Sequence, residues 1–169
     1  MPLLGSTIET PRELYVHKLG AALKMEKTIL DMLPQLEEHA NDPRLKESLR
    51  QHREETKIHV SNLESAFQGL GEDVDESSSP AIDGLEKEGQ ANLKMVDDSL
   101  NDQVIVGGMA ETEHHEIAVY EELITKAAAL GEQQIVDLLQ ANLENEQRTL
   151  QKAKQLGEQI ARSGAVPVA

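Results

Sequence analysis

Four long stretches of this 169-residue sequence repeat apolar residues every three or four positions, the spacing of one face of a helix. Proline and glycine separate them, because Pro is favoured at the first position of a helix and Gly just after its end. The pattern predicts long helices over 10–39, 43–70, 102–130 and 132–162, and a shorter one over about 80–98. No run competes as a β-strand, so the predicted fold class is all-α.

The clearest local signals are the starts of the first two helices. Thr10, Pro11 and Glu13 form the pattern of a capping box, in which the Thr and Glu side chains each bind a backbone N–H of the first turn. Asp42 precedes Pro43 and is a favourable N-cap. These residues predict where the first two helices begin.

The lengths of the connections predict the topology. The turn between the first two long helices is short, and so is the turn between the last two, so each pair should be antiparallel. The polar segment 71–79 and the shorter helix form one long crossover between the pairs. We therefore expect a ferritin-like four-helix bundle: two antiparallel hairpins with a short crossover helix. It should be a single domain over 1–169, with an arm at 1–9, a core over about 10–162 and a tail at 163–169.

The composition disfavours several classes of function. Lys and Arg number 16 against 31 Asp and Glu, a net charge of −15, which repels nucleic acid and anionic lipid and attracts cations. The chain has no Cys, which excludes thiolate zinc sites and iron–sulfur clusters. No segment approaches the roughly 18 apolar residues of a membrane span, and the first residues do not resemble a signal peptide. We expect a cytoplasmic protein without membrane or nucleic-acid partners.

Ionisable residues interrupt the apolar stripes where each long helix should face the core. They are Glu26; His52, Glu55 and His59; Glu113 and Glu116; and Glu146. Because acids are abundant, any one of them is equally consistent with the solvent-exposed edge of its stripe. Several carboxylates in one core would each cost several kcal/mol unless paired, and the stripes hold no Lys or Arg. Two divalent cations would balance them, and oxygen and imidazole ligands without thiolates suit Fe, Mn or Zn.

The positions of the turns allow a geometric test of that cluster. Two residues of an antiparallel hairpin share a height when the turn lies midway between them. The midpoint of Glu26 and Glu55 falls in the Asn-Asp-Pro turn that begins the second helix. The midpoint of Glu116 and Glu146 is Gly131. The acids of each hairpin are therefore predicted to be level with each other.

Four further residues have two interpretations each. Tyr120 lies one turn past Glu116 and is either a core side chain or a functional residue that donates a hydrogen bond or an electron. His52 is either a histidine at the core edge or the hydrogen-bond partner of a ligand. His114 and His115 point away from the stripe and are expected at the surface or in a dimer contact.

These residues resemble the YciE/YciF-like family of bacterial stress proteins, a branch of the ferritin-like superfamily. The resemblance spans about residues 12–160 and is most specific in the third long helix. The segments that carry it are Met25-Glu26-Lys27, Leu33-Pro34, His52-Arg-Glu-Glu55-Thr56, His59-Val60, Glu113-His114-His115-Glu116-Ile117-Ala118-Val119-Tyr120 and Leu143-Glu144-Asn145-Glu146. The resemblance implies a di-metal carboxylate centre, a homodimer and a role in stress.

Three functions are candidates for a chain with these features. The first is a di-iron or di-manganese protein that acts on O2 or peroxide, as a ferroxidase or peroxidase would. Its predicted metal ligands are Glu26, Glu55, His59, Glu113, Glu116 and Glu146, and its candidate catalytic residue is Tyr120. The second is a non-catalytic dimeric stress scaffold with structural metal or none. The third, a metal-free bundle for an apolar ligand, conflicts with the charged stripes. Whether the protein is an enzyme stays open at this point.

Overall fold

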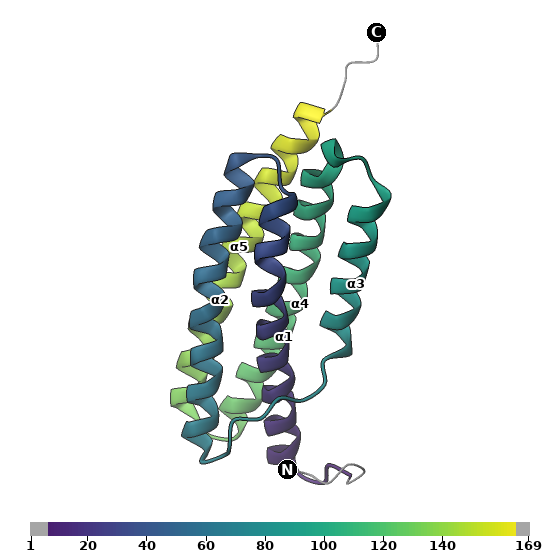
Figure 1. The fold of residues 1–169 in the computed structure, drawn as a ribbon. Coiled ribbons are helices and arrows are strands. Elements are labelled where there is room, and N and C mark those ends of the chain that lie inside the picture. The colour runs from purple at the N-terminus through teal and green to yellow at the C-terminus, as the bar shows by residue number, and fades with distance from the viewer. Residues whose placement is uncertain (1–6, 165–169) are drawn as a thin grey trace.

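The computed structural model describes residues 7–164, and every regular element in that range is helical (Figure 1). The elements are α1 (Pro11–His39), α2 (Pro43–Leu70), α3 (Pro80–Met95), the 3₁₀ helix η1 (Asp98–Leu100), α4 (Asn101–Ala129) and α5 (Gln133–Gly164). The predicted all-α class is confirmed. The outer parts of the predicted arm and tail, 1–6 and 165–169, lie outside the described residues.

The helix ends follow the local signals in the sequence. The Thr10 hydroxyl accepts a hydrogen bond from the Glu13 N–H at 3.1 Å, and the Glu13 carboxylate accepts one from the Thr10 N–H at 3.0 Å. The Asp42 side chain caps α2 by accepting a backbone N–H at 2.8 Å. Gly71 and Gly131 have φ values of 71° and 79°, the left-handed conformation that glycine adopts most readily after a helix.

One predicted boundary is wrong. The crossover helix α3 ends at Met95 and not at residue 98, because the chain becomes extended at Val96. The Asp97 side chain then accepts the Ser99 N–H at 3.0 Å and starts η1, which leads directly into α4. The single predicted helix is therefore a helix followed by a short 3₁₀ turn.

The four long helices pack side by side, and α3 lies outside them (Figure 1). α1 packs on α2 and α4 on α5, while α2 meets α5 and α1 meets α4 across the core. The crossover segment runs over α1, where a Cβ on Gly20 would lie 2.8 Å from the Asp75 carbonyl oxygen. Gly20 therefore allows the long connection to lie close against α1. α3 packs mainly on α4 and to a smaller extent on α1.

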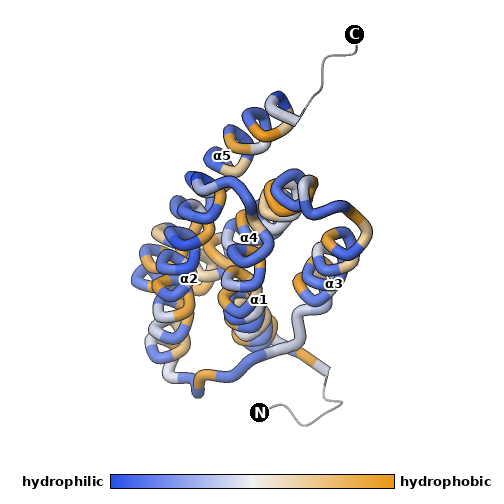
Figure 2. Tube along the Cα trace, turned by 45° about the horizontal axis from the view of Figure 1, so that its top comes forward, coloured by the Kyte–Doolittle hydropathy of each residue, from blue (hydrophilic) through white to orange (hydrophobic). Residues whose placement is uncertain are grey.

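The core is apolar at its ends and polar in the middle. Hydrophobic and hydrophilic residues alternate along the helices, as expected for helices with one buried face (Figure 2). Buried side chains such as Leu19, Leu49 and Leu139 fill much of the interior, but glutamates and histidines from all four long helices are also buried. Among residues 7–164, no helix combines the length and the apolar character that crossing a membrane requires.

Candidate metal centre

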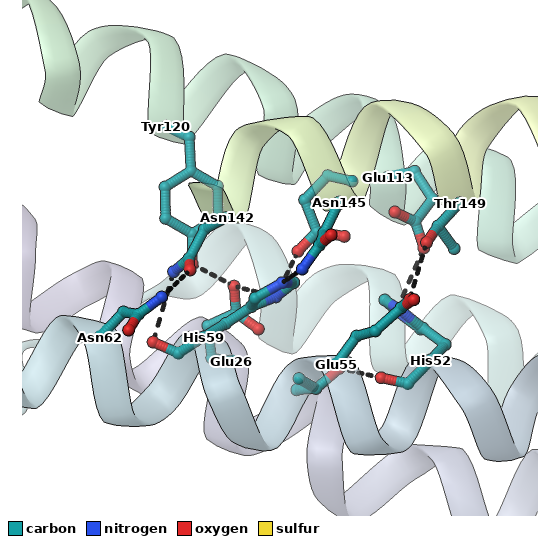
Figure 3. A network of polar contacts seen from close by, with 12 residues as sticks. Glu26, His52, Glu55, His59, Asn62, Glu113, Tyr120, Asn142, Asn145 and Thr149 are labelled. Atoms are coloured by element: carbon teal, nitrogen blue, oxygen red, sulfur yellow. Dashed lines mark hydrogen bonds and ion pairs between the residues drawn. The ribbon is translucent and has the colours of Figure 1, made fainter. Parts of the chain in front are cut away.

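The ionisable residues of the apolar stripes meet inside the core (Figure 3). Six of them are at most 2 % exposed and come from four different helices. They are Glu26 on α1, His52 and His59 on α2, Glu113 and Glu116 on α4, and Glu146 on α5. Burial of this many ionisable side chains is costly, so each must be compensated by a partner, a proton or a cation.

The six residues form two groups that share one carboxylate. In the first, the His52 group, His52, Glu113, Glu116 and Glu146 each offer a ligand atom, and these atoms lie within 4.8 Å of one another. In the second, the His59 group, Glu26, His59 and Glu146 do the same. Glu146 belongs to both groups.

The His59 group contains its own ion pair. His59 Nδ1 lies 2.7 Å from a Glu146 carboxylate oxygen and 3.5 Å from one of Glu26. Burial alone would lower the pKa of His59, but the charges of Glu26 and Glu146 outweigh it and raise the pKa to about 10. Burial would likewise raise the pKa of Glu146, yet the hydrogen bond and charge of His59 bring it below its ordinary value. At neutral pH an imidazolium therefore faces an ionised Glu146.

A chain of hydrogen bonds extends the His59 group toward the surface (Figure 3). The Tyr120 hydroxyl donates to Glu26 and accepts from the Asn142 amide at 3.0 Å. Asn142 also donates to the His59 carbonyl at 3.3 Å and accepts from the half-buried Asn62 at 2.7 Å. Tyr120 is thus fixed from both sides. Sequence reasoning identified Tyr120 but missed the two asparagines, because an Asn on a helix carries no distinctive signal.

The His52 group lacks such partners. Its direct contact is between His52 Nε2 and a Glu113 oxygen, at 3.2 Å. Burial lowers the pKa of His52, so the ring is neutral at pH 7. Burial, reinforced by the charge of Glu146, raises the pKa of both Glu113 and Glu116 well above the ordinary value. Both oxygens of Glu116 and one oxygen of Glu113 have no hydrogen-bond partner within the described residues.

The donor set fits a divalent transition metal. The unpartnered atoms are carboxylate oxygens and an imidazole nitrogen, the ligands favoured by Fe, Mn and Zn. Among residues 7–164, the ion pairs of the buried glutamates involve histidines alone, with no Lys or Arg in contact. Buried oxygens without partners, in a core where neither Lys nor Arg contacts them, could hold a metal ion.

Glu55 lies outside both groups. It is half-buried, and its carboxylate accepts hydrogen bonds from Gln51 at 3.1 Å and from Thr149 at 3.4 Å. The sequence placed it level with Glu26, but His59, one turn further along α2, faces Glu26. Side chains tilt toward the N-terminus of their helix, so Glu26 leans away from the α1–α2 turn while α2 side chains lean toward it. The residue that meets Glu26 must therefore start further from the turn.

Of the other histidines considered above, one belongs to the buried groups and two lie outside them. His52, interpreted from sequence as either a core-edge residue or a partner of a ligand, is a full member of one group. Its spacing of seven residues from His59, two helical turns on the same face, is the signal that could have shown this. His114 is exposed, and His115 is half-buried and outside both groups.

The sequence matches a known protein family and a bacterial protein of similar length. The model of the family DUF892, a domain of unknown function, matches residues 10–166. Protein YciF of Escherichia coli (strain K12) is 24 % identical over 144 residues, which cover 84 % of this chain and 87 % of YciF. The chain thus matches a named bacterial relative over most of the length of both proteins.

Solved structures are similar over almost the whole fold. YcfI of Rhodopseudomonas palustris, described as a candidate structural protein, has a TM-score of 0.87 and 33 % identity over 90 % of this chain and 98 % of its own. The E. coli stress protein YciF has a TM-score of 0.87 and 23 % identity, covering 92 % and 99 %. The protein XCC3681 of Xanthomonas campestris has a TM-score of 0.72 and 24 % identity, covering 91 % and 95 %. The resemblance to YciF-like proteins is therefore confirmed, and the chain belongs to the DUF892 family.

Proposed function

We propose that this protein is a ferritin-like di-metal carboxylate protein that binds two iron or manganese ions and acts on O2 or peroxide in a bacterial stress response. One observation carries the proposal: two buried groups of metal-ligand side chains share Glu146 at the centre of the helical core. The four packed long helices and the long crossover support a ferritin-like bundle.

Each group would hold one ion. His52, Glu113 and Glu116 would bind one ion, Glu26 and His59 the other, and Glu146 would contribute to both. Glu55 is proposed as a further ligand of the His52 group, because its charge already acts on the pKa of His52 and of Glu113. Iron or manganese would supply electron transfer to O2 or peroxide, whereas zinc fits the same donors without redox chemistry.

The residues of the chain prepare this chemistry by holding protons and excluding water. His59, with a pKa of about 10, carries a proton at neutral pH in the metal-free protein, and the raised pKa values of Glu113 and Glu116 mean that both carboxyl groups hold protons more tightly than in water. Those protons must leave when the same atoms become ligands. The Tyr120 hydroxyl holds one Glu26 oxygen in place and is the candidate catalytic group, because it touches a proposed ligand directly.

A second candidate function is a non-catalytic scaffold for the stress response, with structural metal or none. The description of the similar YcfI as a candidate structural protein favours it. Metal content alone does not separate the two functions, but turnover with peroxide does. The family resemblance supports a homodimer in either case, which sedimentation would test.

The test begins with elemental analysis of protein purified without chelator. We expect about two ions per chain, the number required for a centre of this type, and oxidation of a reductant that depends on peroxide. His52→Ala should lose the ion of its group, while His114→Ala, a matched change at an exposed histidine, should keep both. Metal without turnover would favour the scaffold. A chain that takes up no metal from excess Fe²⁺ or Mn²⁺ would overturn the di-metal proposal.

A further inference from the structure

A cavity of about 230 Å³ lies between α1, α3 and α4, next to the candidate metal centre. Buried apolar side chains such as Ile29, Leu33 and Met109 form its inner wall. Exposed residues, among them Glu88 and Glu111, lie at its mouth. The outer wall belongs to α3, which has one buried side chain in total and so is held less firmly than the long helices.

The inner end of the cavity is polar. His52 and Glu113 both line it, and both are at most 2 % exposed. His52 Nδ1 and one Glu113 oxygen have no hydrogen-bond partner among residues 7–164. A pocket with apolar walls and a few buried polar groups at one end is the usual form of a small-molecule site, because the walls supply affinity and the polar groups supply orientation.

Size and charge define the class of ligand. A cavity of about 150 Å³ holds benzene, so this one has room for a somewhat larger molecule. The two glutamates at the mouth and the net charge of −15 repel anions such as fatty acids. The polar end offers an imidazole nitrogen and a carboxylate oxygen, which a hydroxyl satisfies because it both donates and accepts.

We propose that this cavity binds a neutral, largely apolar small molecule with one hydroxyl or hydroperoxyl group, which it directs toward His52 and Glu113. This site shares His52 and Glu113 with the proposed metal centre, and in the metal-free protein the unpartnered atoms of both side chains are free to bind the ligand. If the centre is loaded, the head group of the ligand would lie beside the His52 group. The cavity would then select the substrate of that centre.

The test narrows the cavity from two sides. Gly108 on α4 and Gly89 on α3 line it, and a Cβ added at either meets no atom within 4 Å. Gly108→Leu and Gly89→Leu should therefore fold and place a side chain in or beside the cavity. Gly84→Leu is the matched control, since Gly84 also has open space around its Cβ but lines no part of the cavity. Leucine is the better helix former at all three positions.

Binding is measured by calorimetry with three related probes, using metal-free and metal-loaded protein. We expect 1-naphthol to bind about tenfold more tightly than naphthalene, the contribution of one buried hydrogen bond, and more tightly than 1-naphthoate. Gly108→Leu and Gly89→Leu should each weaken the binding of 1-naphthol at least about tenfold, because the added side chain takes up space in the cavity and so reduces the ligand's own buried apolar surface. Gly84→Leu should bind like the wild type.

Several results would overturn this inference. They are no measurable binding of 1-naphthol, equal affinity in all three leucine variants, and equal or tighter binding of naphthalene or 1-naphthoate. Measuring the metal content of the variants distinguishes a failure of the cavity proposal from a failure of the metal-centre proposal. Gly108 is not a proposed ligand, so Gly108→Leu should keep the wild-type metal-to-chain ratio whether or not the cavity binds a ligand.

Discussion

The two groups of candidate metal ligands, the His52 group and the His59 group, share Glu146 but are compensated differently in the metal-free protein. In the His59 group, the protein supplies the partners: His59 forms an ion pair with Glu146 at 2.7 Å, and Tyr120 donates to Glu26. The charge of the imidazolium offsets the charge of the shared carboxylate. This half of the centre is therefore stable without a metal.

The His52 group has no equivalent compensation. Its histidine is neutral, and burial, reinforced by the charge of Glu146, raises the pKa of Glu113 and of Glu116, which disfavours their charged forms. Both Glu116 oxygens lack partners within the described residues. A cation bound here would give a partner to oxygens that have none, whereas a cation in the His59 group would also have to break the ion pair between His59 and Glu146. We therefore expect the first ion to bind in the His52 group.

The largest effect should come from the residue that belongs to both groups. Glu146→Gln keeps the size of the side chain but removes the shared charge, so both ions should bind more than about a hundredfold more weakly, beyond the range for residues that only support a ligand. Elemental analysis after gel filtration measures the loss. Glu144→Gln, an exposed neighbour on α5, is the control. Retention of either ion by Glu146→Gln would contradict the shared role.

Proton release should distinguish the two histidines. His59 has a pKa of about 10 and must lose a proton to bind a metal, whereas His52 is already neutral at pH 7. Metal binding to His59→Gln should therefore release about one proton fewer per chain than metal binding to the wild type. His52→Gln should not change the number of protons released, because His52 has no proton to lose. Calorimetry in buffers of different ionisation enthalpy measures it near pH 7. Equal proton release in the two variants would remove the proposed difference between the groups.

The stability of the metal-free protein should fall as the pH rises from 7 to 9. The pKa values of His59, Glu113 and Glu116 are higher in the folded state than their ordinary values, so the folded chain binds more protons than the unfolded chain. The loss is about 1.4 kcal/mol per pH unit for each proton by which the two states differ. Urea denaturation with chelator present measures it.

Glu116→Gln makes that test specific. The amide carries no proton to lose, so at pH 8 the metal-free variant should be about 1–3 kcal/mol more stable than the wild type. Its stability should also depend less on pH. A pH dependence identical to that of the wild type would show that Glu116 is not a source of the effect.

The helices and most of the buried glutamates could be predicted from the sequence. The helices and the presence of Glu26, Glu113, Glu116 and Glu146 in the core follow from apolar spacing and from Pro and Gly signals, which are local. Helical spacing identifies the face on which a residue lies. It therefore predicts which residues are buried more reliably than which of them touch.

The pairing across helices was less predictable, because it depends on the tilt of the side chains and on tertiary contacts. Glu26 meets His59 instead of Glu55 for that reason. The division into a compensated and an uncompensated group depends on Asn62, Asn142 and Tyr120, whose contacts span 22 to 94 residues of sequence. The cavity depends on how α3 lies against α1 and α4, which no local pattern encodes.

Substituting two buried tyrosines should show how much the hydrogen bonds of the His59 group contribute to stability, an effect smaller than those above. The Tyr120 hydroxyl has partners on both sides, so Tyr120→Phe removes one hydrogen bond from a Glu26 oxygen and one from the Asn142 amide and should cost about 1–2 kcal/mol. The Tyr15 hydroxyl is buried without a hydrogen-bond partner among the described residues. Tyr15→Phe should therefore be neutral or slightly stabilising. Urea denaturation that shows equal losses would contradict the structural role of the Tyr120 hydroxyl.

The smallest effect is expected at Glu55, the predicted ligand that lies at the edge of the His52 group. Its carboxylate already has hydrogen bonds from Gln51 and Thr149, so binding a metal would exchange these contacts for new ones and gain little. We expect Glu55→Gln to weaken metal binding about tenfold without changing the number of ions, within the range for groups that tune a site. Glu54→Gln, its exposed neighbour, is the control.

Thermal melts measure this effect through linkage. At a metal concentration about 100 times Kd, binding stabilises the wild type by about 2.7 kcal/mol, and tenfold weaker binding leaves about 1.4 kcal/mol. For a chain of this length the difference is about 3–5 °C in Tm. With chelator present, the Tm of Glu55→Gln should equal or slightly exceed that of the wild type. The reason is that the variant lacks a charge that raises the pKa of Glu113. If Glu55→Gln and Glu54→Gln gain the same Tm on adding Fe²⁺ or Mn²⁺, Glu55 is not a ligand and the His52 group binds its ion through buried residues alone.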